Sequence, residues 1–497
     1  MNNLDGGHFN NTYSCLPDYF YTKLDPTPLE NPRLVAFSAS AGQLLDLEDS
    51  WKTREELTLI GSGNRAWPGS EPLAMVYSGH QFGAYNPQLG DGRGLLLGEL
   101  VNTRGEKWDL HLKGAGQTPY SRFGDGRAVL RSCIREYLAS EALHHLGIPT
   151  TRALFVVTSD TPVYRETTEA GSTLLRLARS HIRFGHFEYF YYSAPSGKKR
   201  YKALKELADY TIEQHFHDLE GMAAIAGSDR GYQRFYSEVV RRTATLIAQW
   251  QAAGFAHGIM NTDNMSIIGD TFDYGPYGFM DDFNWYYICN HSDHSGRYAF
   301  SQQPDIGYWN CGRLGQALVP LFDDGELIQK ALDQYPKIYT QTYTRLMLYK
   351  LGLAEEEQDD AELVRNLLQL LHDSRCDYTR FFRILSSFPS EQTSEQLAQL
   401  TSNSSLAPWL DIYQKRLKRN PLNDQTRQQQ MKQVNPKYIL RNYLAQQAIE
   451  KAEQDDYREI ENLMNVLVSP CEEHPDFEHY AQKPPEWGKK LEVSCSS

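Results

Sequence analysis

Residues 257–275 read HGIMNTDNMSIIGDTFDYG, a short stretch rich in polar side chains and glycine. Asn264 follows His257 by seven positions, and a DYG triplet begins at Asp273, nine positions after Asn264. Amide and carboxylate oxygens suit a hard divalent cation that also bridges phosphate groups. We therefore predict a loop and a hairpin that hold a metal ion through Asn264 and Asp273.

The same spacing occurs in the catalytic loop of protein kinases, where a DFG triplet follows the metal-binding Asn. One position differs, because kinases place their catalytic Asp two residues after the His and Ile259 stands there. An isoleucine accepts no proton from a substrate hydroxyl. Either the site is a dead kinase or its chemistry differs, and Asp263 is then the nearest carboxylate for the role of base. The alternative is that Asp263 only stabilises the loop through an Asx turn.

Two details of this region stay open at the level of sequence. Asp281 and Asp282 follow the DYG triplet and are alternative metal ligands. Residues 265–268 read MSII, and we expect them to form a strand. A polar turn ahead of that strand is the alternative to a metal site.

Upstream, a glycine-rich run precedes two predicted strands. The run GDGRG occupies residues 90–94 and leads into an apolar strand at 95–100. A second strand with alternating side chains is predicted at 108–113, and the segment 102–106 between them has the composition of a hairpin turn.

Four residues of this hairpin are candidates for binding phosphate. Gly90 and Gly92 allow a backbone turn to approach phosphate oxygens, and Arg93 adds a guanidinium that binds phosphate in two places. Lys113 ends the second strand, where kinases place their phosphate-binding lysine. Taken alone, an ordinary β-turn and an exposed strand-end lysine would also explain them.

Apolar side chains recur at helical spacing over residues 127–146. Glu136 lies on this predicted helix, and kinases pair the strand lysine with a Glu in that place. Glu141 is a competing candidate for the pair. A second GDGR run leads into the helix, and its Asp125 and Gly126 either cap the helix or contact a nucleotide.

Further strands are predicted at 154–157 and 173–177, and Arg176 and Arg183 lie in or just beyond the second one. Positive charge at such positions stabilises a transferring phosphoryl group. The alternative is that both arginines form ordinary salt bridges.

Strands dominate the first part of the chain, and helical patterns dominate beyond about residue 200, beginning with a long amphipathic helix at 235–253. This order predicts an α+β protein with the two lobes of a kinase-like fold and additional C-terminal helices. We expect an N-terminal extension at 1–69, a nucleotide-binding lobe at 70–170, a metal and catalytic lobe at 171–325, and a helical extension with a cysteine-containing tail at 326–497.

The composition limits the classes of function. The chain has 497 residues, 40% of them hydrophobic, which suffices for a large core. Its net charge of -13 disfavours a nucleic-acid partner. No apolar run approaches the roughly 20 residues that span a bilayer, and the N-terminus does not resemble a signal peptide. The seven cysteines form no CxxC pair, which argues against a zinc site. We expect a monomeric, cytoplasmic bacterial protein.

Four longer stretches resemble the selenoprotein O family. They read YSGHQFGAYNPQLGDGRGLLLGEL at 77–100, LHLKGAGQTPYSRFGDGRAVLRSCIREYL at 110–138, LLRLARSHIRFGHFE at 174–188 and HGIMNTDNMSIIGDTFDYGPYGFMDDF at 257–283. The chain end is also similar, because Cys495 stands third from the end, where some family members carry selenocysteine.

The resemblance implies a kinase-like fold that binds ATP in a flipped orientation and transfers AMP to Ser, Thr or Tyr hydroxyls of protein substrates, with Mg²⁺ or Mn²⁺. Some members are described as using UTP. The resemblance implies that Asp263 is the proton acceptor, that Asn264 and Asp273 hold the metal, and that Glu136 pairs with the strand lysine. The implied nucleotide contacts are Gly90, Gly92, Arg93, Lys113, Asp125, Gly126, Arg176 and Arg183.

The flipped orientation also accounts for Ile259, because a base aimed at the γ-phosphate is then not required. A kinase for a protein or a small molecule, and a non-catalytic nucleotide-binding scaffold, stay open as alternative functions. Cys289 and Cys495 form a further hypothesis, in which a transient disulfide pins the tail over the active site and regulates it. Two unrelated free thiols are the alternative.

Overall fold

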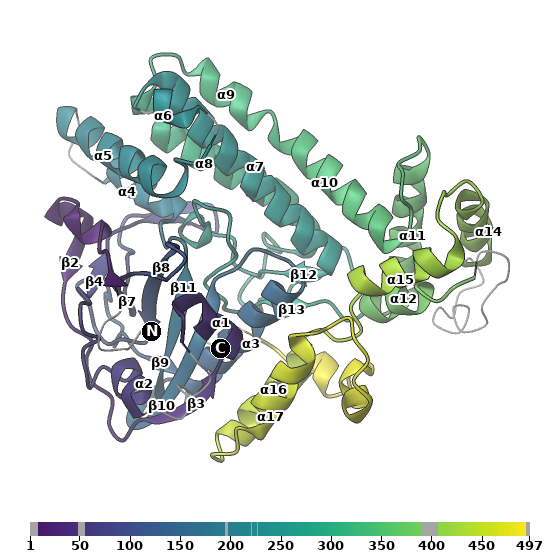
Figure 1. The fold of residues 1–497 in the computed structure, drawn as a ribbon, viewed down its shortest axis with the longest axis horizontal. Coiled ribbons are helices and arrows are strands. Elements are labelled where there is room, and N and C mark those ends of the chain that lie inside the picture. The colour runs from purple at the N-terminus through teal and green to yellow at the C-terminus, as the bar shows by residue number, and fades with distance from the viewer. Residues whose placement is uncertain are drawn as a thin grey trace.

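A computed structural model describes residues 8–47, 55–193, 197–219, 221–225, 227–389 and 406–493. It has a large antiparallel β-sheet near the N-terminus and helices through most of the rest, so the predicted α+β class is confirmed. Figure 1 shows the sheet on one side, the long helices α7 and α10 beside it, and a group of C-terminal helices at the far end.

The sheet is built from nine strands in the described residues. Their order is β2-β4-β7-β8-β11-β10-β3, with β1 paired to β7 and β9 paired to β11. The bounds are β1 His8–Phe9, β2 Tyr21–Lys23, β3 Arg33–Phe37, β4 Leu73–Met75, β7 Gly94–Val101, β8 Lys107–Lys113, β9 Ala128–Val129, β10 Arg152–Tyr164 and β11 Thr168–Ala178. Strands β2 and β3 lie before residue 70, so this early segment is part of the same sheet.

Two short two-stranded ladders complete the strands. One pairs β5 (Gly79–Gln81) with β6 (Ala84–Asn86), and the other pairs β12 (Phe255–Ala256) with β13 (Gly278–Phe279). The predicted strand at 265–268 is wrong, because this segment contributes a single bridge between Ser266 and Arg183. The chain turns away directly afterwards, at Gly269.

Helices cover both faces of the large sheet, which explains why its strands read as continuous apolar runs. On one face, α2 (Glu55–Gly61) packs Leu57 into a core with Phe155 and Leu175. On the other face, α3 (Leu130–His145) packs Ile134 with neighbouring strand residues. The short α1 (Ala39–Gly42) lies beside the edge strand β3.

Helix α3 begins three residues later than predicted. Ala128 and Val129 pair with β11 instead of starting the helix, and no side chain caps its first turn. The predicted cap at Asp125 or Gly126 is therefore wrong. The Asp125 carboxylate accepts a hydrogen bond from the Arg127 amide at 2.9 Å, within the loop ahead of β9.

Helix α7 (Asp229–Ala253) is the long amphipathic helix predicted from the sequence, extended by six residues at its start. The Ser228 hydroxyl accepts from the Gly231 amide and caps it. Gly254 ends the helix in the left-handed region at φ 68°. A Cβ at this position would also approach the Tyr378 ring at 3.0 Å, so a glycine is required on two counts.

The remaining helices form layers beyond the sheet. Their bounds are α4 Phe184–Tyr192, α5 Lys198–His215, α6 Met222–Ile225, α8 Gln303–Leu318, α9 Glu326–Leu332, α10 Tyr335–Lys350, α11 Asp360–Ser374, α12 Tyr378–Leu385, α14 Leu406–Leu417, α15 Asp424–Val434, α16 Asn442–Ala452 and α17 Arg458–Leu467. The predicted helical character after residue 325 is confirmed. Among the described residues, no helix combines the length and apolar character needed to cross a membrane.

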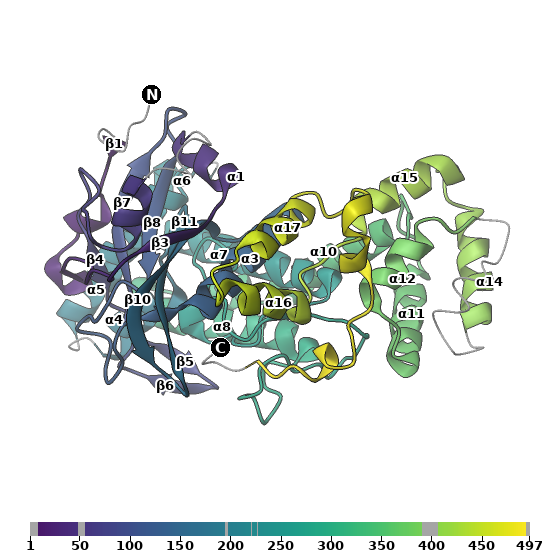
Figure 2. The same ribbon diagram turned by 90° about the horizontal axis from the view of Figure 1, so that it is seen from below.

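The C-terminal helices pack in two places. Helices α10, α11, α12 and α14 share their own core around Leu367, Phe381 and Trp409. The pair α16–α17 turns back and packs against α3, with Leu444 and Leu463 in the same core as Leu138. Figure 2 shows this pair beside α3, between the sheet and the distal helices. Helix α3 is thus held between the sheet and the end of the chain.

Candidate active site

A cavity of about 350 Å³ opens between the sheet and the helical part of the chain. All the nucleotide and metal contacts implied by the family resemblance line this cavity. They are Gly90, Gly92, Arg93, Lys113, Asp125, Gly126, Arg176, Arg183, Asn264 and Asp273. Ile259, the residue in place of the kinase base, lines it as well. The sheet and the distant loop therefore converge on one site, as the sequence interpretation required.

Basic side chains outnumber acidic ones in the wall of this cavity. The basic residues are Arg93, Lys113, Arg122, Arg127, Arg165, Arg176 and Arg183, and the acidic ones are Asp91, Asp125 and Asp273. The excess of positive charge contrasts with the net charge of -13 of the whole chain. Such a concentration of cations in a cleft favours a polyanion such as a triphosphate.

The glycine-rich turn ahead of β7 forms one wall. Gly90 adopts φ +116°, and a Cβ there would lie 2.8 Å from the Tyr120 ring, so a side chain does not fit. The Asp91 carboxylate holds the turn by accepting from the Met75 amide at 3.0 Å and lying 3.3 Å from His111 Nε2. Gly92 and Arg93 follow on the cavity side.

Lys113 and Glu136 form a buried ion pair, with Nζ 2.5 Å from Oε2. Burial lowers the pKa of Lys113, and Glu136 opposes this shift. Burial alone would raise the pKa of Glu136, but Lys113 and Arg176 outweigh it and lower that pKa. The lowered pKa keeps Glu136 ionised beside the lysine. The competing residue Glu141 instead pairs with Arg152 at 2.7 Å, away from the cavity.

Asp273 is held between two buried guanidinium groups. Its Oδ1 lies 2.5 Å from Arg176 Nη1, and its Oδ2 pairs with Arg183. Arg176 also reaches Glu136 at 3.4 Å, so a chain of alternating charges runs from Lys113 to Arg183. A triphosphate in the cavity would pair with the same guanidinium groups that pair with Asp273 in the structure.

Asn264 lies in a single helical turn, Thr262–Asn264, at the wall of the cavity. Its amide nitrogen donates to the Ile259 carbonyl at 3.1 Å, so its amide oxygen is the atom available to a cation. With the Asp273 carboxylate, this donor set fits Mg²⁺ or Mn²⁺ with further ligands from phosphate and water. Within the described ranges, no group of three or more His, Cys, Asp or Glu side chains could hold a metal. An ion here would therefore be shared with the nucleotide.

The alternative metal ligands lie elsewhere. Asp281 pairs with Arg441, and Asp282 bridges to the backbone of Asp377 near the C-terminal helices. Neither residue lines the cavity.

Asp263 directly precedes Asn264 but does not itself line the cavity, and it is 7% exposed. Its Oδ2 accepts from Gln81 Nε2 at 3.2 Å, while its Oδ1 is buried without a hydrogen-bond partner among the described residues. Burial raises the pKa of Asp263 to about 6, although Arg183 opposes the shift. A carboxylate with an unused acceptor and a raised pKa has the properties of a general base.

Strand β5 covers Asp263, which the sequence did not suggest. A Cβ on Gly79 would approach Oδ1 of Asp263 at 2.6 Å. The neighbouring Thr262 hydroxyl donates to Glu188 at 2.6 Å and fixes the loop against α4. His257 anchors the other side, because its Nε2 lies 2.9 Å from the Phe272 carbonyl, next to Asp273.

Sequence reasoning also missed His111. It lines the cavity and contacts Arg176 Nη2 through Nδ1 at 2.9 Å, opposite its contact with Asp91. Burial and then Arg176 lower the pKa of His111 to about 3, so it is a neutral group that orients the guanidinium. The alternation of β8 was a usable signal, because His111 and Lys113 share one face of that strand.

Cys289 is buried, and its thiol donates to the Ala256 carbonyl at 3.4 Å. Burial raises the pKa of Cys289 to about 12. Cys495 lies outside the described residues. The last of these, Val493, accepts a hydrogen bond from the His291 amide at 2.8 Å. The end of the described tail therefore contacts His291, which follows Cys289 by two positions in the sequence.

The sequence of this chain is similar to those of known proteins over most of its length. A family model described as "Protein adenylyltransferase SelO" matches residues 5–468. A curated relative from Stutzerimonas stutzeri, named protein nucleotidyltransferase YdiU, is 53% identical and covers 100% of both chains. Relatives of the same name from Azotobacter vinelandii and Pseudomonas aeruginosa strain UCBPP-PA14 are 52% and 51% identical, again over 100% of both chains. The chain belongs to the SelO family of protein adenylyltransferases.

Proposed function

We propose that this protein transfers AMP from ATP to a Ser, Thr or Tyr hydroxyl of a protein substrate, at the cavity between the sheet and the catalytic loop. The proposal includes transfer of UMP from UTP at the same cavity. The main support is that residues from both halves of the chain line one cation-rich cavity that also contains Ile259. Family membership makes the chain a protein nucleotidyltransferase.

The arrangement also supports a kinase-like fold. A strand lysine pairs with a helix glutamate, and an Asn and an Asp from a separate loop meet them across one cavity. We propose two kinase-like lobes that meet at this cavity, with the segment before residue 70 adding strands to the first lobe and the helices after residue 325 extending the second. We also propose a monomeric cytoplasmic protein without a nucleic-acid partner.

The burial of the cations supports a flipped nucleotide. Lys113, Arg176 and Arg183 are each less than 5% exposed, so the innermost part of the cavity is charged and unsuited to an adenine ring. The terminal phosphates would enter first and pair with these residues. The α-phosphate would then lie nearer to the substrate hydroxyl, and pyrophosphate would leave into a site already lined with positive charge.

Asp263 would accept the proton of the attacking hydroxyl, since its Oδ1 has no partner and it is ionised above about pH 6. Glu136 would hold Lys113 in place, and His111 would orient Arg176. Asn264 and Asp273 would hold Mg²⁺ or Mn²⁺, which would neutralise charge on the phosphates. Gly90, Gly92, Arg93, Asp125 and Gly126 would contact the rest of the nucleotide.

ATP labelled at either the α- or the γ-phosphate tests the reaction. We expect label from the α-phosphate to appear on protein in the presence of Mg²⁺ or Mn²⁺, and none from the γ-phosphate. Transfer from the γ-phosphate alone would identify a kinase. Transfer from neither, with nucleotide binding intact, would identify a scaffold.

We also propose that Cys289 and Cys495 form a regulatory disulfide, which the course of the tail past His291 supports. The two thiols would form one S–S bond and transfer two electrons and two protons to an added oxidant such as diamide. Because Cys289 is buried with a raised pKa, we expect slow oxidation.

Non-reducing gels compare the wild type with Cys495→Ser, and with Cys471→Ser as a control, since the Cys471 thiol donates to the Gln433 carbonyl and the Cys289 thiol to the Ala256 carbonyl. After oxidation, the wild type and the control should migrate faster than Cys495→Ser, and a reductant should remove the difference. Equal mobility of all three proteins under oxidant would end the hypothesis.

A further inference from the structure

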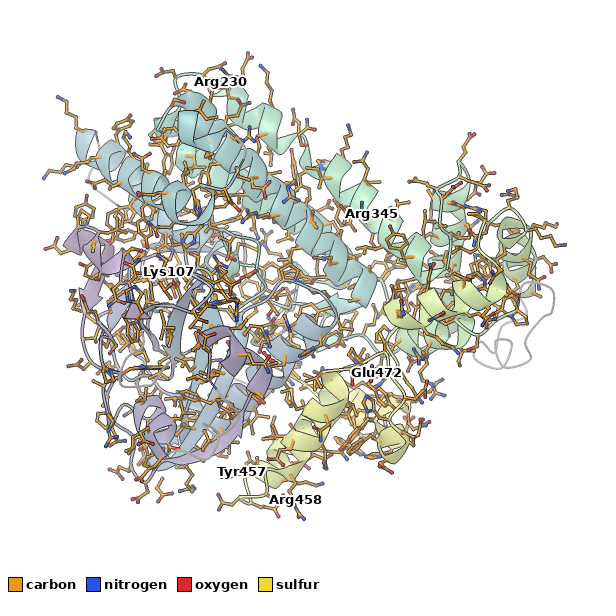
Figure 3. The ribbon with its side chains drawn as sticks, viewed as in Figure 1. Lys107, Arg230, Arg345, Tyr457, Arg458 and Glu472 are labelled. Carbon is orange, nitrogen blue, oxygen red and sulfur yellow. The ribbon has the colours of Figure 1, made fainter. Side chains whose placement is uncertain are left out.

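A second cavity, of about 240 Å³, lies where the ends of several helices meet and shares no lining residue with the nucleotide site. The ends of α3, α7, α10 and α15 contribute to it, together with Thr379 of α12 and Cys471. Figure 3 labels Glu472, the neighbour of Cys471, at the junction between the α16–α17 pair and the distal helices.

Lys350, in the last turn of α10, lines this cavity with a side chain that is almost fully withdrawn from solvent. The residue is 6% exposed. Its Nζ lies 4.5 Å from the centre of the Phe382 ring and 5.3 Å from that of Tyr378. Among the described residues, no carboxylate forms an ion pair with it and no acceptor takes a hydrogen bond from it. Aromatic faces compensate a buried ammonium only in part, so the ammonium is suited to pair with an anion in the cavity.

Two other polar groups in the same wall also lack partners. The Nε2 atom of His145 and the Oε1 atom of Gln249 are both buried without a hydrogen bond in the described structure. Two such atoms thus accompany an unpaired lysine at one cavity. Lys350, His145 and Gln249 together form a polar surface suited to the head group of a ligand.

The rest of the wall is mainly apolar. Ile148, Leu346, Val434 and Pro436 provide aliphatic surface, and the exposed side chains of Tyr349 and Val434 mark the mouth. The volume is about two-thirds of that of the nucleotide site, which favours a ligand smaller than ATP. A single lysine also suits one negative charge better than a phosphate ester with two.

We propose that this cavity binds a small amphipathic monocarboxylate, whose carboxylate pairs with Lys350 and whose apolar body packs against Leu346, Val434 and Pro436. His145 and Gln249 would add hydrogen bonds to the same head group. Because the cavity joins the end of the helix that carries Glu136 to the distal helices, the bound ligand would tie these parts together and raise thermal stability.

Calorimetry with 3-phenylpropionate and the full chain at pH 7 tests this site. We expect the carboxylate to bind at least about tenfold more tightly than the neutral analogue 3-phenyl-1-propanol. Lys350→Met keeps the aliphatic stem and should weaken binding of the carboxylate by a similar factor. Lys337→Met removes an exposed lysine from the same helix and should leave binding unchanged. Equal affinity of the wild type and Lys350→Met, or no binding to the wild type at 10 mM, would overturn the assignment.

A titration of the wild type keeps the test independent of how the variants fold. Burial lowers the pKa of Lys350 to about 8, so affinity for the carboxylate should fall between pH 7 and pH 9.5 while the alcohol is unaffected. The other titratable groups at the cavity are His145, Tyr349, Tyr378 and Cys471. Burial lowers the pKa of His145 and raises those of Tyr378 and Cys471. Constant affinity over this range would contradict a role for Lys350.

Discussion

Asp273→Ala should abolish AMP transfer while the protein still binds ATP. The carboxylate is one of the two protein groups that we propose as ligands of the divalent cation, and without it the charge on the phosphates would not be neutralised in the required place. In the structure, however, the same carboxylate pairs with Arg176 and Arg183. Its loss frees both guanidinium groups for phosphate, so binding of metal-free ATP should be unchanged or tighter.

The variant should therefore separate binding from transfer. Loss of a partner for two buried arginines should reduce the free energy of unfolding by about 1–3 kcal/mol without ligand. ATP in the presence of a chelator should raise Tm by more in Asp273→Ala than in the wild type, because the phosphates replace the missing carboxylate.

Thermal unfolding with and without ATP, beside the α-phosphate transfer assay, measures both effects. Asp281→Asn is the matched control, since Asp281 follows closely in sequence but pairs with Arg441 outside the cavity. It should retain transfer. Transfer by Asp273→Ala within about tenfold of the wild type, or loss of transfer in Asp281→Asn, would reassign the metal ligand.

The sequence predicted those parts of the site that rest on short-range spacing. Lys113 follows the glycine turn by one hairpin, and the strand period fixes which face it shares with His111. Asn264 and Asp273 lie at fixed offsets from His257. Their meeting across one cavity was an expectation from kinases, and the geometry of the described residues agrees with it.

The parts that sequence reasoning missed depend on long-range pairing. Val129 carries an apolar side chain at helical spacing, yet it extends along β11, and this shifts the start of α3. The segment 265–268 has strand composition, but it finds one bridging partner and then turns. Strand β5 reaches Asp263 across 182 residues, through Gln81. Local periodicity contains no information about such partners.

Asp263 is the residue that we propose as the general base. Asp263→Asn should slow AMP transfer by about 10²–10⁴-fold, the usual contribution of a general base. The same change should increase stability. Burial raises the pKa of Asp263 to about 6, above its ordinary value of 3.8, so the ionised form is disfavoured in the folded state. Wild-type stability therefore falls as pH rises from about 4 to 6, whereas the neutral amide avoids this loss.

Above pH 6, Asp263→Asn should exceed the wild type in free energy of unfolding by about 1–3 kcal/mol, and the difference should shrink toward pH 4. Asp270 provides a matched control, because burial also raises its pKa to about 6 but its neighbouring charges are Arg242 and Arg179, which do not line the cavity. Asp270→Asn should gain stability in the same way and keep its activity.

Denaturant unfolding and transfer rates between pH 5 and 8 distinguish a base from a merely buried carboxylate. Wild-type kcat/KM should fall as pH drops below about 6, because protonated Asp263 cannot accept the hydroxyl proton. Asp263→Asn should lack this dependence, while Asp270→Asn should retain it. If Asp263→Asn gained stability but transferred AMP at the wild-type rate, Asp263 would be a buried carboxylate without a catalytic role. Its Oδ1 would then lack a partner only because β5 packs closely over it, and another group would accept the proton.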